Sequence, residues 1–135
     1  MQAKLKFAVA VLVGAALGVT ATSIVHAQQA AAKGKGYIIS EITVTDPAAF
    51  AKYVAAVPPT LAPFGGQYLT RGNAQIVGLE GTAPQRFIAI QFDSFDKAKA
   101  WQESEGYAQA KALRLPAQDA ATSRVFLVEG IPPTP

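Results

Sequence analysis

The segment FGGQYLTRGN, residues 64–73, decides the fold of this chain. Its glycine pair, Gly65 and Gly66, allows the positive φ angle with which many helices end. The residues that follow predict a strand, with Tyr68 on one face and Arg71 on the other. Because the glycines precede a strand, whereas phosphate-binding glycine loops precede helices, they do not indicate a phosphate site.

Before this segment the sequence predicts a strand and then a helix. The strand runs from Tyr37 to Val44 and is rich in β-branched residues. Asp46 and Pro47 mark a helix start, because the carboxylate accepts from free N–H groups and proline suits the first helical position. The helix must break at Pro58, since proline lacks a backbone donor. Apolar side chains recur at the spacing of one helix face: Phe50, Tyr53, Val54 and Val57.

From Gly66 onward, the sequence predicts three further strands and a second helical region. The second strand spans about Gly66 to Val77, with a bulge at Gly72 or Asn73, and a loop follows to Gln85. The third strand, Arg86 to Phe92, is apolar on both faces, which places it in the centre of the sheet. The remaining elements are a helical region from Asp93–Ser94 to Pro116, interrupted near residues 104–106, and a fourth strand from Arg124 to Glu129.

This order predicts an α+β fold of the ferredoxin-like βαββαβ type, with a four-stranded antiparallel sheet. The domain would cover residues 36–131, after a flexible segment at 28–35. Two helical regions can cover only one face of such a sheet. The other face carries apolar side chains such as Ile39 and Phe87, so we expect a second copy to cover it in a homodimer.

Residues 1–27 have the three parts of a secretory signal peptide. Lys4 and Lys6 precede an uncharged apolar run from Phe7 to Val19, and a small-x-small pattern ends at Ala27. A membrane anchor is the alternative, but the apolar run is shorter than the about 20 residues that a span needs. We therefore expect cleavage after Ala27 and a periplasmic or secreted protein that has no contact with the membrane after cleavage.

Removal of the leader changes which side chains the mature protein has for binding and catalysis. The mature chain of 108 residues keeps ten basic and nine acidic side chains, a net charge of +1, which does not indicate nucleic-acid binding. It also loses the only histidine, His26, and the chain has no cysteine. A Ser-His-Asp triad, a thiol nucleophile, a His- or Cys-based zinc site and a haem held by His, Cys or Met are thereby excluded. All-oxygen sites for Mg or Ca stay open, but no carboxylate run has calcium-loop spacing, and we expect neither metal nor cofactor.

A series of motifs extends from the strand and helix start at 37–47 through Val-Pro-Pro-Thr at 57–60, residues 64–72 and Leu-Glu-Gly at 79–81 to Trp101, Ser104, Tyr107 and Val-Glu-Gly at 128–130. In these motifs the chain resembles the domain of unknown function 1330 family. The resemblance implies a dimeric α/β barrel in a ferredoxin-like superfamily that includes cofactor-free monooxygenases and haem-degrading enzymes. The family has no settled activity. Thr82 and Gln102 stand where the family often has aromatic residues.

Two residues are candidates for catalysis as well as ligand binding. Glu41 lies among apolar neighbours and could be a general base, or could form an ion pair with Arg71 or another cation. Arg71 offers a planar fork for a carboxylate or enolate, or could serve a dimer interface. The basic residues Lys111 and Arg114 are explained by the helix dipole alone. The candidate ligand-binding residues are Glu41, Tyr53, Tyr68, Arg71, Trp101 and Tyr107, of which the aromatic ones could equally belong to the core.

Three functions are compatible with these residues. The first is a homodimeric binding protein that holds a small aromatic or acidic molecule between sheet and helices. The second is a cofactor-independent monooxygenase or isomerase, with Glu41 removing a proton and Arg71 stabilising the oxyanion. The third is a structural or interaction module. The sequence does not decide whether the protein is an enzyme.

We predict that the chain beginning at Gln28 sediments as a dimer at micromolar concentration. Exposing the second apolar face of the sheet would forfeit about 25 cal/mol for each Å² of apolar surface. Sedimentation equilibrium measures the mass directly. A single species with the mass of one 108-residue chain would contradict the prediction.

Overall fold

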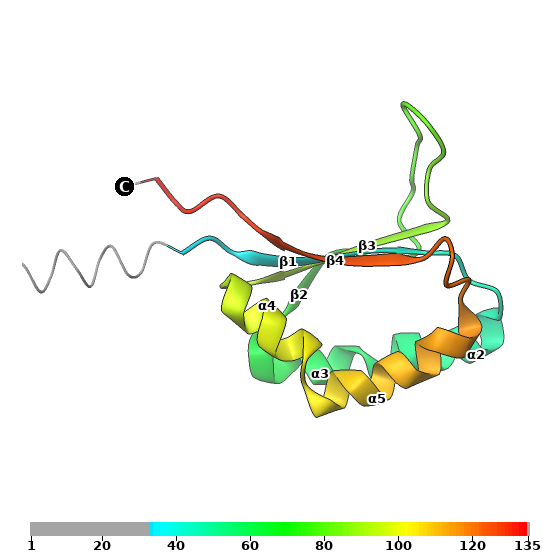
Figure 1. Cartoon of the computed structure of the whole chain (residues 1–135), viewed down its shortest axis with the longest axis horizontal. Coiled ribbons are helices and arrows are strands. Elements are labelled where there is room, and N and C mark those ends of the chain that lie inside the picture. The colour runs from blue at the N-terminus through cyan, green and yellow to red at the C-terminus, as the bar shows by residue number, and fades with distance from the viewer. Residues whose placement is uncertain (1–32, 135) are drawn as a thin grey trace, which may run out of the picture. The chain divides into compact units, whose positions relative to one another are not determined.

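The computed structural model describes residues 33–134, and within them helices pack against one face of a four-stranded sheet (Figure 1). The predicted leader and most of the segment at 28–35 lie outside the described residues. The strands are β1 (Gly36–Ile42), β2 (Gln67–Thr70), β3 (Arg86–Phe92) and β4 (Arg124–Glu129). The helices are α2 (Pro47–Ala56), α3 (Pro58–Leu61), α4 (Phe95–Gln102) and α5 (Glu105–Arg114), with 3₁₀ turns η1 (Ala62–Phe64) and η2 (Leu115–Ala117).

The sheet has the strand order β2-β3-β1-β4, and all neighbouring strands are antiparallel. This confirms the α+β, ferredoxin-like prediction and the central place of β3. Ile38 of β1 lies opposite both Ile90 of β3 and Leu127 of β4. Alternate residues of β1 are buried beneath the helices, because successive side chains point to opposite faces. The first strand is shorter than predicted, and Val44 forms only an isolated bridge to Gln118.

The second strand is much shorter than the predicted span of Gly66 to Val77. It ends at Thr70, where the register with β3 shifts. The Thr70 hydroxyl accepts from the Ala89 N–H at 3.0 Å and donates to the Phe87 carbonyl at 3.3 Å. These side-chain bonds replace the backbone ladder, so the strand stops there, and the irregularity precedes the predicted bulge at Gly72 or Asn73. Residues 71–85 form a loop that leaves the sheet on the side away from the helices (Figure 1).

The glycine pair ends the preceding helical region as predicted. Gly65 has φ = 69°, and its N–H donates to the Ala62 carbonyl. The Gly66 N–H donates to the Leu61 carbonyl, which completes a Schellman motif. A Cβ at Gly66 would lie 2.7 Å from the Phe92 ring. One glycine therefore supplies the left-handed turn, and the other permits close packing on the core.

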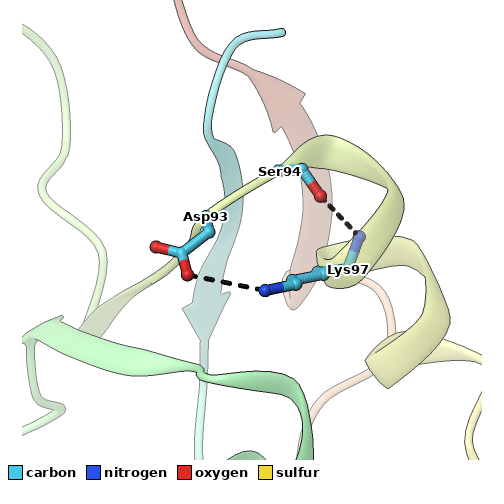
Figure 2. A network of polar contacts seen from close by, with 3 residues as sticks. All are labelled: Asp93, Ser94 and Lys97. Atoms are coloured by element: carbon cyan, nitrogen blue, oxygen red, sulfur yellow. Dashed lines mark hydrogen bonds and ion pairs between the residues drawn. The ribbon is translucent and has the colours of Figure 1, made fainter. Parts of the chain in front are cut away.

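Helix starts are fixed by side-chain caps. Asp46 accepts from the Ala49 N–H at the start of α2. Ser94 accepts from the Lys97 N–H at 3.1 Å, and Lys97 also lies 3.5 Å from Asp93 (Figure 2). Ser104 caps α5 in the same way. Ser104 thereby separates the second helical region into α4 and α5, whereas α3 begins at Pro58 without a side-chain cap.

The main core is centred on Trp101, which is 1% exposed. Its ring packs against Phe92 and Tyr107, and its indole N–H donates to the Thr60 hydroxyl at 3.0 Å. The hydrogen bond satisfies the polar atom that burial removes from water. Trp101 therefore joins α3, α4, α5 and the sheet.

The opposite face of the sheet, called the open face below, has no helix over it among the described residues (Figure 1). Large apolar side chains lie exposed along it, including Leu69 at 55% and Phe126 at 45%. Ile39 lies between Ala89 and Phe126 on the same face. Within one chain these apolar side chains are in contact with water.

We predict that Gly36→Ala lowers the free energy of unfolding by roughly 1–3 kcal/mol. A Cβ at Gly36 would lie 2.5 Å from the Ser94 carbonyl oxygen and 2.8 Å from the Phe95 Cα, so α4 would have to move. Gly106→Ala is the matched control, because its Cβ would meet only Thr60 at 3.5 Å. Urea unfolding should show a loss for the first variant and none for the second. Equal stabilities would contradict this account of the packing of α4 on β1.

Candidate functional site

A cavity of about 370 Å³ lies between α2 and the helix-covered face of the sheet. We call it the α2–sheet cavity. Its apolar walls come from α2 and from the central strands, and include Phe50, Val54, Val57, Ile88 and Ile90. Its polar groups come from β1, the end of β2, the following loop and the start of β3: Ser40, Tyr68, Arg71, Asn73 and Arg86. Apolar walls with a few polar groups are typical of small-molecule sites.

A second hollow of about 460 Å³ adjoins this cavity and is more open to solvent. The two share Phe50, Val54, Gly72 and Arg86. Gln85 lines the second hollow, and its side-chain oxygen accepts from the Val44 N–H at 2.6 Å. This bond attaches the end of the 71–85 loop to the residues that follow β1. The hydrogen bond thus holds the C-terminal end of the 71–85 loop beside the cavity.

Arg71 lies on the same side as Tyr68, which corrects the prediction that they occupy opposite faces. The guanidinium carbon is 5.1 Å from the centre of the Tyr68 ring, and both residues line the α2–sheet cavity. The physical reason is that β2 ends at Thr70, so the alternation of faces does not extend to residue 71. The chain turns there, and the side chain of Arg71 packs over the ring.

Of the two arginines that line the cavity, Arg86 is the more buried. Its guanidinium carbon is 5.1 Å from the centre of the Phe50 ring. The Nε atom is buried and has no hydrogen-bond partner among the described residues. Gly72 allows this placement, because a Cβ there would lie only 2.6 Å from that Nε atom.

Tyr53 of α2, Tyr107 of α5 and the buried Arg114 lie on the helix side of the cavity, and Tyr68 of β2 lies on its sheet side. Burial raises the pKa of Tyr53 far above its ordinary value of 10.0, and Tyr107 raises it further, partly through a hydrogen bond. Arg114, whose guanidinium carbon is 5.5 Å from the Tyr53 ring, acts in the opposite direction. Burial also raises the pKa of Tyr68. Tyr53 and Tyr68 are therefore neutral hydrogen-bonding groups near neutral pH.

The structure separates Glu41 from this cavity. Glu41 lies on the open face, where its carboxylate is 2.6 Å from the guanidinium of Arg124. Of the alternatives left open by the sequence, an ion pair with a cation other than Arg71 is the one found. The structure therefore does not bring Glu41 and Arg71 together around one substrate in a single chain.

The six candidate residues fall into three groups, the first of which is Glu41 alone on the open face. Tyr53, Tyr68 and Arg71 line the α2–sheet cavity. Trp101 and Tyr107 are each 1% exposed and belong to the core. Tyr107 still affects the cavity indirectly, through Tyr53.

Sequence reasoning missed two cationic residues that the structure places at this site. Arg86 shares strand parity with Ile88 and Ile90, a signal that places it on the helix-covered face. Arg114 follows Tyr107 at i+7 on α5 and is only 3% exposed, so helical spacing places it on the buried face. Arg114 donates to Gln118 at 2.7 Å and supports Tyr53 from behind.

The sequence pattern of the family described as Domain of unknown function (DUF1330) matches residues 35–131. This chain belongs to that family. The DUF1330 match spans the sheet, the helices and the cavity residues, and it confirms the resemblance drawn from the motifs. No curated protein matches the chain.

The solved structures that resemble this DUF1330 chain have low sequence identity to it. The RPA0582 protein of unknown function from Rhodopseudomonas palustris is 18% identical, with a TM-score of 0.54, over 82% of this chain and 94% of that one. A candidate antibiotic biosynthesis monooxygenase from Caulobacter crescentus CB15 is 15% identical, with a TM-score of 0.51, over 78% and 98%. A dimeric ferredoxin-like protein of unknown function from Thermobifida fusca YX is 13% identical, with a TM-score of 0.46, over 71% and 91%. For the first two structures, whose TM-scores exceed 0.5, the likeness concerns the fold alone.

The described residues offer no clustered set of metal ligands. Among residues 33–134 no group of three or more His, Cys, Asp or Glu side chains could hold a metal ion.

In the same part of the chain, no helix has the length and apolar character that crossing a bilayer requires. The polar groups that line the cavity are guanidinium, phenol, amide and aliphatic hydroxyl groups.

We predict that stability falls as pH rises above the ordinary tyrosine value of 10.0, with Tyr53 contributing to the loss. Because the folded pKa is raised, the unfolded chain ionises first and is favoured as pH increases. Thermal unfolding between about pH 9 and 11 measures the effect. Tyr53→Phe should reduce the slope of the melting temperature against pH. An identical slope in the variant and the unaltered protein would contradict the assignment.

Proposed function

We propose that this protein is an exported homodimer that binds a small molecule in the α2–sheet cavity. The observation that carries the proposal is the cavity itself. It has the size and the lining of a ligand site, with Arg71, Tyr68 and Asn73 as polar groups beside an apolar interior.

The apolar wall of the cavity supports binding of a partly apolar ligand. Val54 is 47% exposed, although it lies on the predicted apolar face of α2. It lines both the α2–sheet cavity and the adjoining hollow. A ligand over Val54 and Phe50 would remove this apolar surface from water.

The open face supports the homodimer. Leu69, Phe126 and Val128 are each at least 45% exposed in one chain, and they continue the apolar surface of the central strands. A two-fold partner would cover this face with the same residues. Glu41 and Arg124 already neutralise each other there, so the face presents little unpaired charge to a second copy.

Export is supported by the leader alone. Residues 1–27 carry the basic, apolar and small-residue parts of a signal peptide. A chain without cysteine would reach its destination with no disulfide to form. The ligand would then be a molecule present outside the cytoplasm.

Thermal-shift screening of the chain from Gln28 against a metabolite library tests the binding function. Ligand in large excess over its Kd should raise the melting temperature by several degrees. Val54→Trp should abolish the shift, because the indole would fill space where the α2–sheet cavity and the adjoining hollow meet.

Ala55→Trp is the matched control, since Ala55 is exposed on the same helix and does not line either cavity. The control should keep the shift. Circular dichroism should show that both variants are folded. No stabilising ligand at millimolar concentration, or equal shifts in both variants, would contradict the proposal.

A further inference from the structure

We infer that the ligand of the α2–sheet cavity carries a carboxylate on an apolar body, and that Arg86 and Arg71 bind the carboxylate. This inference rests on the proposed function, because it requires that the cavity holds a small molecule. It adds the chemical class of that molecule and the residues that select it.

The first argument is the charge of the cavity. Two guanidinium groups, from Arg71 and Arg86, line it, and no Asp or Glu of the described residues lines it or the adjoining hollow. Among residues 33–134, neither arginine forms an ion pair with a carboxylate. A third guanidinium, that of Arg114, lies behind Tyr53 and is also without a carboxylate partner in that range. The positive charge around the cavity is therefore not neutralised by the described protein.

The second argument is the unpaired donor of Arg86. Its Nε–H is buried and unpartnered in the part of the chain that the structure describes. Burial of an unpaired polar donor is costly, and an acceptor at this position would remove the cost. A guanidinium presents Nε–H and a terminal N–H in parallel, which matches the two oxygens of a carboxylate.

The third argument is that the rings hold the guanidiniums without using their donors. Arg86 stacks on Phe50 and Arg71 on Tyr68, each with the guanidinium carbon 5.1 Å from the ring centre. Such stacking fixes the plane of the cation and leaves the N–H groups at its edge available. Arg71 is exposed, whereas Arg86 is half-buried, so Arg71 would act at the entrance and Arg86 further inside.

The remaining wall determines the rest of the ligand. Val57, Ile88 and Ile90 face the cavity and offer no charge. Tyr53 and Tyr68, kept neutral by burial, add aromatic surface and one hydroxyl each. An aromatic or branched aliphatic body fits this wall, whereas a polyanion without an apolar part would leave it wet.

The test compares matched pairs of probes on the folded chain from Gln28. Arylcarboxylates such as phenylacetate are titrated beside their neutral amides, such as phenylacetamide, and beside inorganic phosphate. Heteronuclear NMR shifts report both affinity and location. We expect each carboxylate to bind roughly tenfold or more tightly than its amide, since a charged hydrogen bond would be lost.

Arg86→Gln should remove that preference and leave amide binding within about twofold, because only the charged contact is lost. Lys52→Gln is the matched control, because it deletes the same charge from an exposed position of α2 outside the cavity. Gly72→Val provides a second route, since its side chain would displace the Arg86 guanidinium without removing the charge. It should also abolish the preference, and it serves if Arg86→Gln does not fold.

The outcomes separate the two proposals. If library molecules bind and Val54→Trp blocks them, but carboxylates bind no better than amides, the cavity is a ligand site and the inference about its class is wrong. Equal losses in Lys52→Gln and Arg86→Gln would overturn the role of Arg86. Binding of phosphate as tight as that of the arylcarboxylates would also overturn the inference. If no probe and no library molecule binds, both proposals fall.

Discussion

The alternation of side chains along β1 and β3 is the constraint on which the rest of the structure depends. Both strands are central, and both carry apolar residues on each face. One face is closed by α2, α4 and α5, and it forms the core around Trp101 together with the α2–sheet cavity. The other face meets no helix in the described part of the chain. Strand parity therefore decides which residues can contact a ligand and which can contact a partner.

This division explains which charged residues are paired with an opposite charge and which are not. Glu41 and Arg124 face away from the helices and neutralise each other. Arg71, Arg86 and Arg114 lie on the helix side, where aromatic rings hold them in place of carboxylates. Stacking on a ring positions a guanidinium but does not neutralise it. One face of the sheet is thus electrically balanced, whereas the other keeps a local excess of positive charge.

The fold could be predicted from the sequence because its signals are local and agree with one another. Asp46 and Ser94 cap the helices that they were expected to start, Ser104 caps α5 at the expected interruption, and the glycine pair ends a helical region as expected. The site was harder, because it depends on where β2 stops. That end is set by the hydrogen bonds of the Thr70 hydroxyl to β3, a contact between residues 17 and 19 positions apart, which no local pattern reveals. Arg86 and Arg114 were within reach of strand parity and helical spacing, but their basic side chains suggested exposure.

The 71–85 loop leaves the sheet at Arg71 and returns at Gln85, next to Arg86. Its two ends line the cavities, whereas its middle, with Leu79 at 92% exposure, lies on the side away from the helices (Figure 1). The ends are fixed by the Thr70 and Gln85 hydrogen bonds, which do not involve the tip. Insertions, deletions and substitutions at the tip could therefore change its length and its side chains in relatives while the arginines stay in place. Ligand preference and surface recognition could then diverge separately within one scaffold.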